Sequence, residues 1–491
     1  MHIEKLLTAK QEESFELVAE YINKLVYFNR QDLSLDQIIE EIKIGTTIGT
    51  NALLEKKGAR TALIVTKGFK DLLEIGHQNR ESLFSLNIKN EKRFWENSFE
   101  VGGRINSSGK IIEALDKNKL RKILEINNIK NFDSVAIALV NSYINPEHEK
   151  LVAQQLKDLG FDNIVLSHLS SSTLGYVDRA NTAVVDAYLL TLLHEYVASL
   201  KRALGRTTFS IMQSHGGLTD AENFQGRNSI LSGPAGGVIG AVKTAKYRGF
   251  SRIICFDMGG TSTDVAHYND NYEYRSQSKI ESIAINSNSM DISTVAAGGG
   301  SIVKFDGIRY KVGPESAGAY PGPACYGNGG PATVTDCNVL IGVIRPEFFP
   351  ALFGEEKNLK IDKTLVVSSF EKIAESARAS STRDSSIFQV AEGLLDLAVE
   401  KMANAIKKIL IDKGHDLKDY ILNCYGGAAA QHCCAVADSL GIEKIFISVN
   451  ASVLSALGIG LSDKQTIVEE SINQVLCPTN IDNLIGIVDK I

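Results

Sequence analysis

A short stretch rich in glycine, hydroxyl and carboxylate groups, FDMGGTSTDVA at residues 256–266, holds the side chains best suited to chemistry. Apolar residues on both sides of it predict two strands, residues 252–257 and 264–268, joined by a tight polar hairpin. Gly259 and Gly260 can adopt positive φ and let a ligand approach the backbone amides, which together form a nest suited to an anion. Thr261, Ser262 and Thr263 add hydroxyl donors.

The carboxylates of Asp257 and Asp264 would repel a bare phosphate, but they suit a site in which hydrated Mg²⁺ stands between carboxylate and phosphate. The hairpin therefore predicts a nucleotide phosphate with its metal, positioned by these two aspartates. The alternative is a polar glycine turn with no ligand, which a GG pair alone would favour. The added hydroxyl groups favour the phosphate.

Two neighbouring glycine motifs strengthen this interpretation. Gly236 and Gly237 lie in a small-residue helix just before the hairpin and let that helix pack closely against an element that crosses it. Gly426 and Gly427 end a later strand where a helix begins, and amides at such a turn can face a nucleotide. His432, at the start of that helix, could contact a ligand or cap the turn.

Composition excludes several classes of protein. A chain of 491 residues with 44% hydrophobic and 22% charged residues predicts two or three globular domains. The formal net charge of −6, without a long basic run, argues against a nucleic-acid partner. The first residues lack a signal-peptide core, and no window approaches the roughly 18 apolar residues that span a bilayer, so we expect a cytosolic protein without a membrane partner.

Cysteine and histidine spacing points to no metal or disulfide framework. The seven cysteines form no CxxC pair, and the nine histidines form no HExxH or comparable pattern. We therefore expect neither disulfides nor a zinc site built from these residues.

Alternating helix and strand patterns predict an α/β protein with a boundary near residue 185. The predicted strands include residues 61–66, 134–140 and 420–424, and the predicted helices include residues 146–159, 181–204 and 390–413. Glycine and proline crowd residues 295–335, which indicates an ordered binding loop.

The motifs, in their order along the chain, resemble the hydantoinase A and 5-oxoprolinase family of the actin-like ATPase superfamily. Those that carry the resemblance are GTTIGTNALLEKKGARTALIVTKGF, LSGPAGGVIGA, FDMGGTSTDVA, TVAAGGGSIV, VGPESAGAYPGPACYG, TVTDCNVLIG and GGAAAQHCCAVADSLG. AAGGGS and the glutamine of AAAQH are closest to the ATP-dependent 5-oxoprolinase branch.

This resemblance implies a two-lobed, ribonuclease H-like α/β fold with mixed sheets flanked by helices. It divides the chain into an N-terminal region at residues 1–185, a core with phosphate and adenosine motifs at 186–470, and a tail at 471–491. It implies ATP with Mg²⁺ or Mn²⁺ as cofactors. The implied reaction is ATP-driven opening of 5-oxoproline, a hydantoin or a similar cyclic amide, with 5-oxoproline giving glutamate.

Further candidate residues lie outside the hairpin. His77, Gln78 and Arg80 could bind substrate, and Arg80 suits bidentate capture of a carboxylate, although a solvated loop is an equal alternative. Glu315 and Asp336, in and after the glycine-rich loop, are candidate acid/base groups or ordinary loop carboxylates.

The chain also departs from the family pattern. It starts after the position of a first DxGGTxTD hairpin and stops at Ile491, before a further C-terminal region, so we expect a chain truncated at both ends. Alanines 429 and 430 stand where glycines are usual. The alternatives to an active hydrolase are a catalytically silent nucleotide-binding subunit and the ATP-using subunit of a ketone carboxylase. A hydantoinase B-like partner subunit and a homo- or hetero-oligomer would fit these readings.

Overall fold

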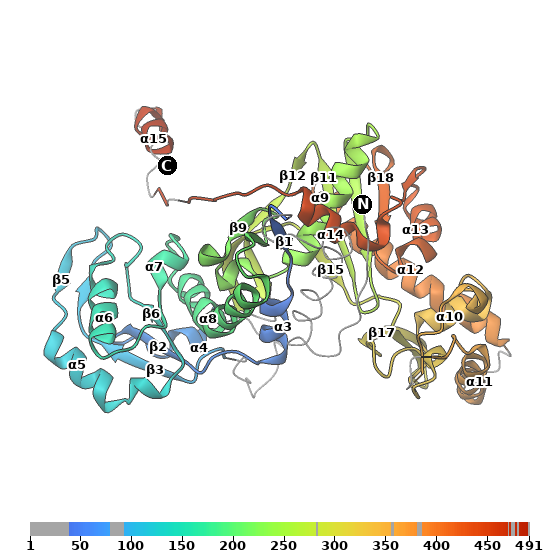
Figure 1. Ribbon diagram of the computed structural model, residues 1–491, viewed down its shortest axis with the longest axis horizontal. Coiled ribbons are helices and arrows are strands. Elements are labelled where there is room, and N and C mark those ends of the chain that lie inside the picture. Colours follow the sequence, from blue (N-terminus) through green and yellow to red (C-terminus); the bar gives the residue numbers. More distant parts are fainter. Residues whose placement is uncertain are drawn as a thin grey trace, which may run out of the picture. The chain divides into compact units, whose positions relative to one another are not determined.

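The computed structural model describes residues 39–78, 93–280, 283–354, 358–380, 385–469, 471–472, 477–478 and 481–489 (Figure 1). The chain forms two compact units. Unit 1 comprises Met1–Gly233, Tyr274–Ser289 and Ser462–Ile491, and unit 2 comprises Pro234–Glu273 and Met290–Leu461. The boundary expected near residue 185 falls inside a long helix, α8 (Tyr176–Leu204), so compactness divides the chain differently from the predicted regions.

A mixed sheet forms the centre of unit 2. Its strand order is β12-β11-β10-β18-β19, and β15 pairs with the first three residues of β11. The strands are β10 (Arg252–Met258), β11 (Thr263–Asn269), β12 (Asn271–Tyr272), β15 (Ser293–Val295), β18 (Ile421–Tyr425) and β19 (Ile445–Phe446). β10 runs antiparallel to β11 and parallel to β18, so the expected hairpin and the expected strand at residues 420–424 are adjacent.

Helices bury the apolar side chains of this sheet. One core cluster joins Ile254 and Phe256 of β10 to Leu394 and Met402 of α12 and to Val436 of α13. The helices of unit 2 are α9 (Ser232–Tyr247), which begins in unit 1, α10 (Val334–Ile341), α11 (Lys363–Ser380), α12 (Ile387–Ile411), α13 (Cys433–Leu440) and α14 (Leu454–Leu461). A hairpin of β16 (Ser301–Phe305) and β17 (Tyr310–Ser316) completes the unit.

A four-stranded parallel sheet organises unit 1, in the order β3-β2-β6-β7. Its strands are β2 (Thr61–Thr66), β3 (Asn97–Val101), β6 (Ser134–Ala138) and β7 (Ile164–Leu166). β2 and β6 are buried along their whole length, as their nearly continuous apolar sequences predict. On one face they pack against α5 (Lys117–Ile126) and α6 (Glu147–Asp158), and on the other against α3 (Ile48–Glu55) and α8 (Tyr176–Leu204).

The smaller elements of unit 1 are a second sheet, two hairpins and short helices. They are β1 (Ile42–Ile44), β8 (Phe209–Met212) and β9 (Leu218–Asp220) in one sheet, β4 (Arg104–Ile105) with β5 (Ile111–Glu113), β13 (Tyr274–Ile280) with β14 (Ile283–Met290), and the helices α4 (Leu72–Ile75), α7 (Ser167–Ser170) and α15 (Ile481–Val488). The apolar spacing at residues 12–27 also predicts a helix, but these residues lie outside the described part of the chain.

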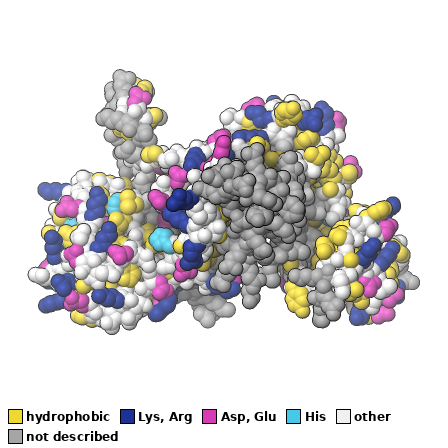
Figure 2. All heavy atoms as spheres, viewed as in Figure 1, with side chains coloured by type: hydrophobic (Ala, Val, Ile, Leu, Met, Phe, Trp, Pro, Cys, Tyr) yellow, Lys and Arg dark blue, Asp and Glu magenta, His cyan; other side chains and the backbone are white. Residues whose placement is uncertain are grey.

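α8 is the one helix among the described residues that is long and apolar enough to cross a bilayer. More than half of its apolar window is buried inside the protein, where Val184, Leu189 and Leu193 pack in the unit 1 core. This burial is typical of a core helix. On the face in Figure 2, Lys and Arg side chains of the described residues are interspersed with Asp and Glu and form no broad basic area.

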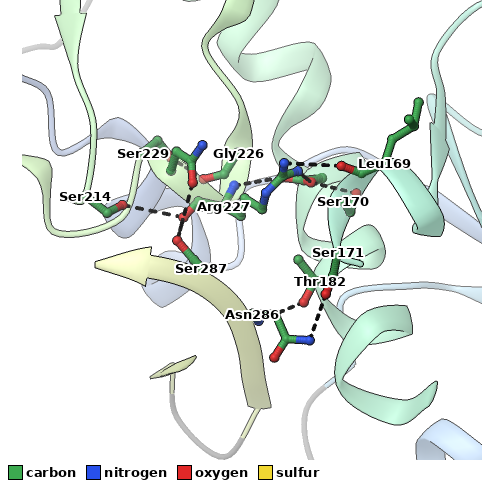
Figure 3. A network of polar contacts seen from close by, with 12 residues as sticks. Leu169, Ser170, Ser171, Thr182, Ser214, Gly226, Arg227, Ser229, Asn286 and Ser287 are labelled. Carbon is green, nitrogen blue, oxygen red and sulfur yellow. Dashed lines mark hydrogen bonds and ion pairs between the residues drawn. The ribbon is translucent and has the colours of Figure 1, made fainter. Parts of the chain in front are cut away.

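A polar network ties the β14 segment into unit 1 (Figure 3). Arg227 donates from Nη1 to Asp186 Oδ2 at 2.6 Å and from its backbone amide to Asp186 Oδ1 at 2.7 Å. The carbonyl oxygen of Arg227 accepts from the hydroxyl of Ser287, which is in β14, at 2.9 Å. Asn286 donates its amide to Thr182 of α8 at 2.8 Å. These contacts explain why residues 274–289 belong to unit 1 although the chain on both sides belongs to unit 2.

Loss of the buried ion pair should destabilise unit 1. Both partners are largely buried, so an Arg227→Met variant leaves the Asp186 carboxylate without its charge partner, at a cost of about 3–5 kcal/mol in the free energy of unfolding. Urea unfolding followed by circular dichroism measures the change. Arg121→Met, which breaks an exposed pair with Glu125 on α5, is the control and should unfold almost as the wild type does. Equal stability of the two variants would contradict the role of the network.

Candidate functional site

The predicted hairpin lies at one end of the β10–β11 ladder in unit 2. Asp257 and Asp264 are direct partners across the two antiparallel strands, so their side chains emerge on the same face of the sheet. The Gly259 amide donates to the Ser262 carbonyl oxygen at 3.1 Å and closes the turn. A Cβ added at Gly260 would meet no atom within 4 Å, so this part of the turn borders open space.

Burial and mutual repulsion make ionisation of the two carboxyl groups costly. Burial, and then the charge of Asp264, raise the pKa of Asp257 to about 7. Burial also raises the pKa of Asp264, against the opposing effect of a hydrogen bond that its Oδ1 accepts from Thr294 Oγ1 at 2.6 Å. A divalent cation between the two groups would compensate both charges. The residues therefore fit a hard divalent ion such as Mg²⁺ or Mn²⁺.

Three consecutive glycines, residues 298–300, hold the hairpin through backbone hydrogen bonds and close packing. The Gly299 amide donates to Gly259 O at 3.1 Å, and the Gly300 amide donates to Gly260 O at 2.6 Å. A Cβ at Gly298 would lie 2.7 Å from Gly260 O and from the Ser262 amide nitrogen, which is too close for any side chain. The crowding of glycine and proline at residues 295–335 indicates a binding loop, and within it residues 298–300 fix the shape of the hairpin through these contacts.

The hydroxyl groups of the hairpin do not all face the same way. Thr263 is fully buried, and its Oγ1 donates to Ala297 O at 2.5 Å. Thr261 is exposed and Ser262 is partly exposed. The Thr263 side chain therefore anchors the hairpin to the glycine loop, and of the three hydroxyl groups only those of Thr261 and Ser262 remain candidates for a phosphate.

The glycine turn after β18 lies directly against the catalytic candidate Asp257. Gly426 has φ of 86°, and a Cβ added there would lie 2.3 Å from Asp257 Oδ1. The Ala428 amide donates to Met258 O at 2.9 Å, whereas a Cβ at Gly427 would meet nothing within 4 Å. Ala429, which stands where glycine is usual in the resembled family, is fully buried, so its methyl group faces the core.

Thr335 connects these loops to α10. Its amide and its Oγ1 both donate to Gly299 O, at 2.8 and 2.9 Å. A Cβ at Gly299 would lie 2.8 Å from Thr335 Oγ1 and 3.8 Å from the Ala428 side chain. Gly299 is thus the point where the hairpin, the glycine turn and α10 converge. The run of three glycines was the available signal, but sequence alone did not show which backbone they approach.

Gly236 and Gly237 serve helix packing, as the small-residue pattern predicted. A Cβ at Gly236 would lie 2.7 Å from Ile459 Cγ1 of α14, and one at Gly237 would lie 2.9 Å from the Tyr425 ring. These surroundings leave no room for a nucleotide at either Cα. His432 is also enclosed: burial lowers its pKa to about 4, and its Nε2 lies 3.1 Å from Asn338 Nδ2.

The acid/base candidates Glu315 and Asp336 have separate surroundings. Glu315 is exposed on β17 and pairs with Lys304 at 2.6 Å, which lowers the pKa of its carboxyl group. Asp336 is fully buried at the start of α10, where it accepts hydrogen bonds from the Thr333 amide and hydroxyl, both at 2.8 Å, and from the amides of residues 324 and 325. Four donors occupy this carboxylate, which gives it a capping role in the fold.

The proposed substrate cluster belongs to unit 1. His77 Nε2 lies 2.6 Å from Oδ1 of Asp178, a residue that sequence reasoning did not single out. Gln78 is exposed and has φ of 58°. Arg80 lies outside the described residues.

Substitution of Gly426 should disturb the aspartate pair. Gly426→Ala places a methyl group against Asp257 at positive φ, with an expected cost of about 1–3 kcal/mol in stability and displacement of the carboxylate. Gly427→Ala is the matched control, because its Cβ enters open space. Thermal unfolding measures the difference, and equal midpoints for the two variants would contradict the packing described above.

The raised pKa of Asp257 predicts a specific pH dependence of stability. Native Asp257 keeps its proton up to pH about 7, whereas an unfolded aspartate releases it near pH 4. Between these values the native state binds more protons, so wild-type stability falls as pH rises. Asp257→Asn has no such proton. Its free energy of unfolding should therefore rise relative to that of the wild type by roughly 3 kcal/mol between about pH 4.5 and pH 8. Urea unfolding at both pH values tests this, and a constant difference would refute the assignment.

Several known proteins are similar to this chain over most of its length. The chain is 37% identical to 5-oxoprolinase 1 of Arabidopsis thaliana over 91% of its own length and 38% of that protein's length. It is 30% identical to the acetophenone carboxylase gamma subunit of Aromatoleum aromaticum over 89% of this chain and 62% of the subunit. The crystal structure of ATP-dependent caprolactamase from Pseudomonas jessenii matches with a TM-score of 0.78 and 28% identity, over 94% of this chain and 68% of that one.

The structural likeness confirms the expected α/β fold of the actin-like ATPase type. The family model for the hydantoinase/oxoprolinase N-terminal region matches residues 1–160, and the hydantoinase/oxoprolinase model matches residues 179–468. The chain therefore belongs to the hydantoinase/oxoprolinase family.

Proposed function

We propose that unit 2 binds Mg-ATP, or Mn-ATP, at the β10–β11 hairpin and that the protein uses it to hydrolyse a cyclic amide, 5-oxoproline to glutamate in the first instance. The observation that carries this proposal is the pair Asp257 and Asp264, partly buried side by side at the end of the ladder and bordered by open backbone at Gly260 and Gly427. A carboxylate pair with raised pKa values suits a site that is completed by a cation and its phosphate.

Each part of the site has a role in this proposal. Asp257 and Asp264 hold the metal ion and its water, and the amides and hydroxyl groups of residues 259–262 contact the phosphates. The metal ion would spread the negative charge that develops on the transferred phosphoryl group. The turn at Gly426 and Gly427 lies on the other side of Asp257 and contacts the nucleoside. The support from residues 298–300 keeps the hairpin amides in place before the ligand arrives.

The proposed reaction makes a stable lactam susceptible to water. The γ-phosphoryl group passes from ATP to the amide oxygen of the ring, leaving ADP. Water then adds to the ring carbon, and the C–N bond breaks with protonation of nitrogen to leave an acyl phosphate. A second water attacks the acyl carbon, and phosphate leaves with the former amide oxygen, which gives the free carboxylate. Holding the phosphoryl group and the lactam oxygen in line supplies much of the rate enhancement. Arg80, with His77 and Gln78, is the proposed binding group for the substrate carboxylate.

The names of the relatives support this function and also one alternative. A 5-oxoprolinase and an ATP-dependent caprolactamase match most of this chain, which favours an ATP-dependent amide hydrolase. The acetophenone carboxylase gamma subunit matches 89% of the chain and favours a second candidate, the ATP-using subunit of a ketone carboxylase. Both versions are compatible with a hydantoinase B-like partner and with an oligomeric assembly.

Substrate-stimulated ATP hydrolysis distinguishes these functions. With Mg²⁺ present, 5-oxoproline should increase phosphate release and yield glutamate in step with ADP, and Asp264→Asn should lower the rate by about 100-fold or more. Glu315→Gln, on the exposed pair with Lys304, is the matched carboxylate control and should keep its rate.

The same assay is run with a hydantoin, and with acetophenone plus bicarbonate, each with and without a hydantoinase B-like protein. Stimulation by acetophenone and bicarbonate alone would support the carboxylase subunit. Nucleotide binding without hydrolysis under every condition would contradict both proposals and leave the silent binding subunit.

A further inference from the structure

Two histidines and a glutamate from separate segments of unit 2 meet at one place. They are His267 of β11, Glu273, which follows β12, and His415, which follows α12. One ligand atom from each lies within 4.8 Å of the other two. The spacing of histidines in the sequence gave no sign of this cluster, because folding brings its members together from distant parts of the chain.

His267 has an unusual environment for a histidine. It is 3% exposed, and neither of its ring nitrogens has a hydrogen-bond partner among the described residues. Its Nε2 lies 2.9 Å from Glu273 Oε1 without the alignment of a hydrogen bond. Burial, and then the charge of Lys413 and the nearby His415, lower the pKa of His267 to about 4. In its neutral form an imidazole ring has one nitrogen with a free lone pair, which can bind a metal ion.

This arrangement matches the requirements of a transition-metal ion. Neutral imidazole nitrogen and carboxylate oxygen bind Zn²⁺ at about 2.0–2.2 Å, and tetrahedral geometry then separates ligand atoms by about 3.3 Å. The 2.9 Å between His267 Nε2 and Glu273 Oε1 is close to that separation. The Tyr420 ring packs against both imidazoles, with centroids 6.2 Å from His267 and 5.8 Å from His415, and limits their rotation.

The charges around the cluster also favour a cation. Lys413 contacts the second carboxylate oxygen of Glu273 and pairs with Asp291 Oδ2 at 2.6 Å. Two carboxylates and one ammonium group leave a net charge of −1 beside two histidines. Lys413 therefore competes with a cation for Glu273, and its pair with Asp291 weakens that competition.

We propose that His267, Glu273 and His415 form a site for a divalent transition-metal ion of the Zn²⁺ or Co²⁺ type, with solvent at the remaining position. The site is separate from the proposed nucleotide site. His267 is three residues beyond Asp264 on β11, so the two side chains lie on opposite faces of the sheet, about 10 Å apart along the strand. A bound ion would join β11, the end of β12 and the segment after α12, and would stabilise unit 2.

Cobalt titration of the metal-free 491-residue protein tests the proposal. Co²⁺ should bind with d–d absorption typical of nitrogen and oxygen ligands and with no sulfur charge-transfer band. His415→Gln and Glu273→Gln, whose side chains are partly exposed, should each weaken binding by at least about tenfold. Zn²⁺ should raise the unfolding midpoint of the wild type and leave that of His415→Gln unchanged.

Two variants serve as controls. Cys434→Ser removes an exposed thiol that could bind the same ions, and it should bind Co²⁺ as the wild type does. Lys413→Met removes the ammonium group that competes for Glu273 and should bind Co²⁺ more tightly. The proposal is overturned if the wild type binds no Co²⁺, if His415→Gln and Glu273→Gln keep wild-type affinity, or if Cys434→Ser loses binding.

Discussion

Asp257 and Asp264 face each other across the β10–β11 ladder, and the cost of ionising both determines how the surrounding loops are built. Two carboxylates at this separation repel one another, and burial increases that repulsion. Among the residues that the structure describes, no lysine or arginine pairs with either carboxylate, and Thr294 donates a single hydroxyl to Asp264. Such a pair is costly in the free protein and becomes favourable when a divalent cation lies between the two groups.

The glycine loops follow from this constraint. A hairpin that presents backbone amides to a ligand has few side chains of its own to hold it, so residues 298–300 support it through their amides and through very close packing. Gly426 must be glycine because its Cα lies against Asp257, whereas Gly427 borders open space. Backbone groups of the hairpin and of the glycine loops therefore form the rigid part of the site. This fits electrostatic stabilisation by groups that are fixed before the ligand binds.

Sequence periodicity predicted the main elements of the fold well. The strands at residues 61–66 and 134–138, the hairpin, and the helices α6, α8 and α12 lie within a few residues of their predicted bounds, because strong apolar patterns and glycine stops mark their ends. Alternation along β11 could also have shown that Thr263 faces away from Asp264. Contacts between distant segments could not be read in this way. The support from residues 298–300, the two amides that residues 324 and 325 supply to Asp336 and the meeting of His267 with His415 depend on tertiary packing.

The most direct test of the central claim is the number of protons released when Mg-nucleotide binds. Calorimetry near pH 6, in buffers of different ionisation enthalpy and with nucleotide already saturated with Mg²⁺, measures this number. A cation at Asp257 and Asp264 should expel the proton that Asp257 holds at this pH, so the wild type should release about one proton more per nucleotide than Asp257→Asn. Equal proton release and equal affinity in the two proteins would contradict the assignment of this aspartate pair to the metal of a bound nucleotide.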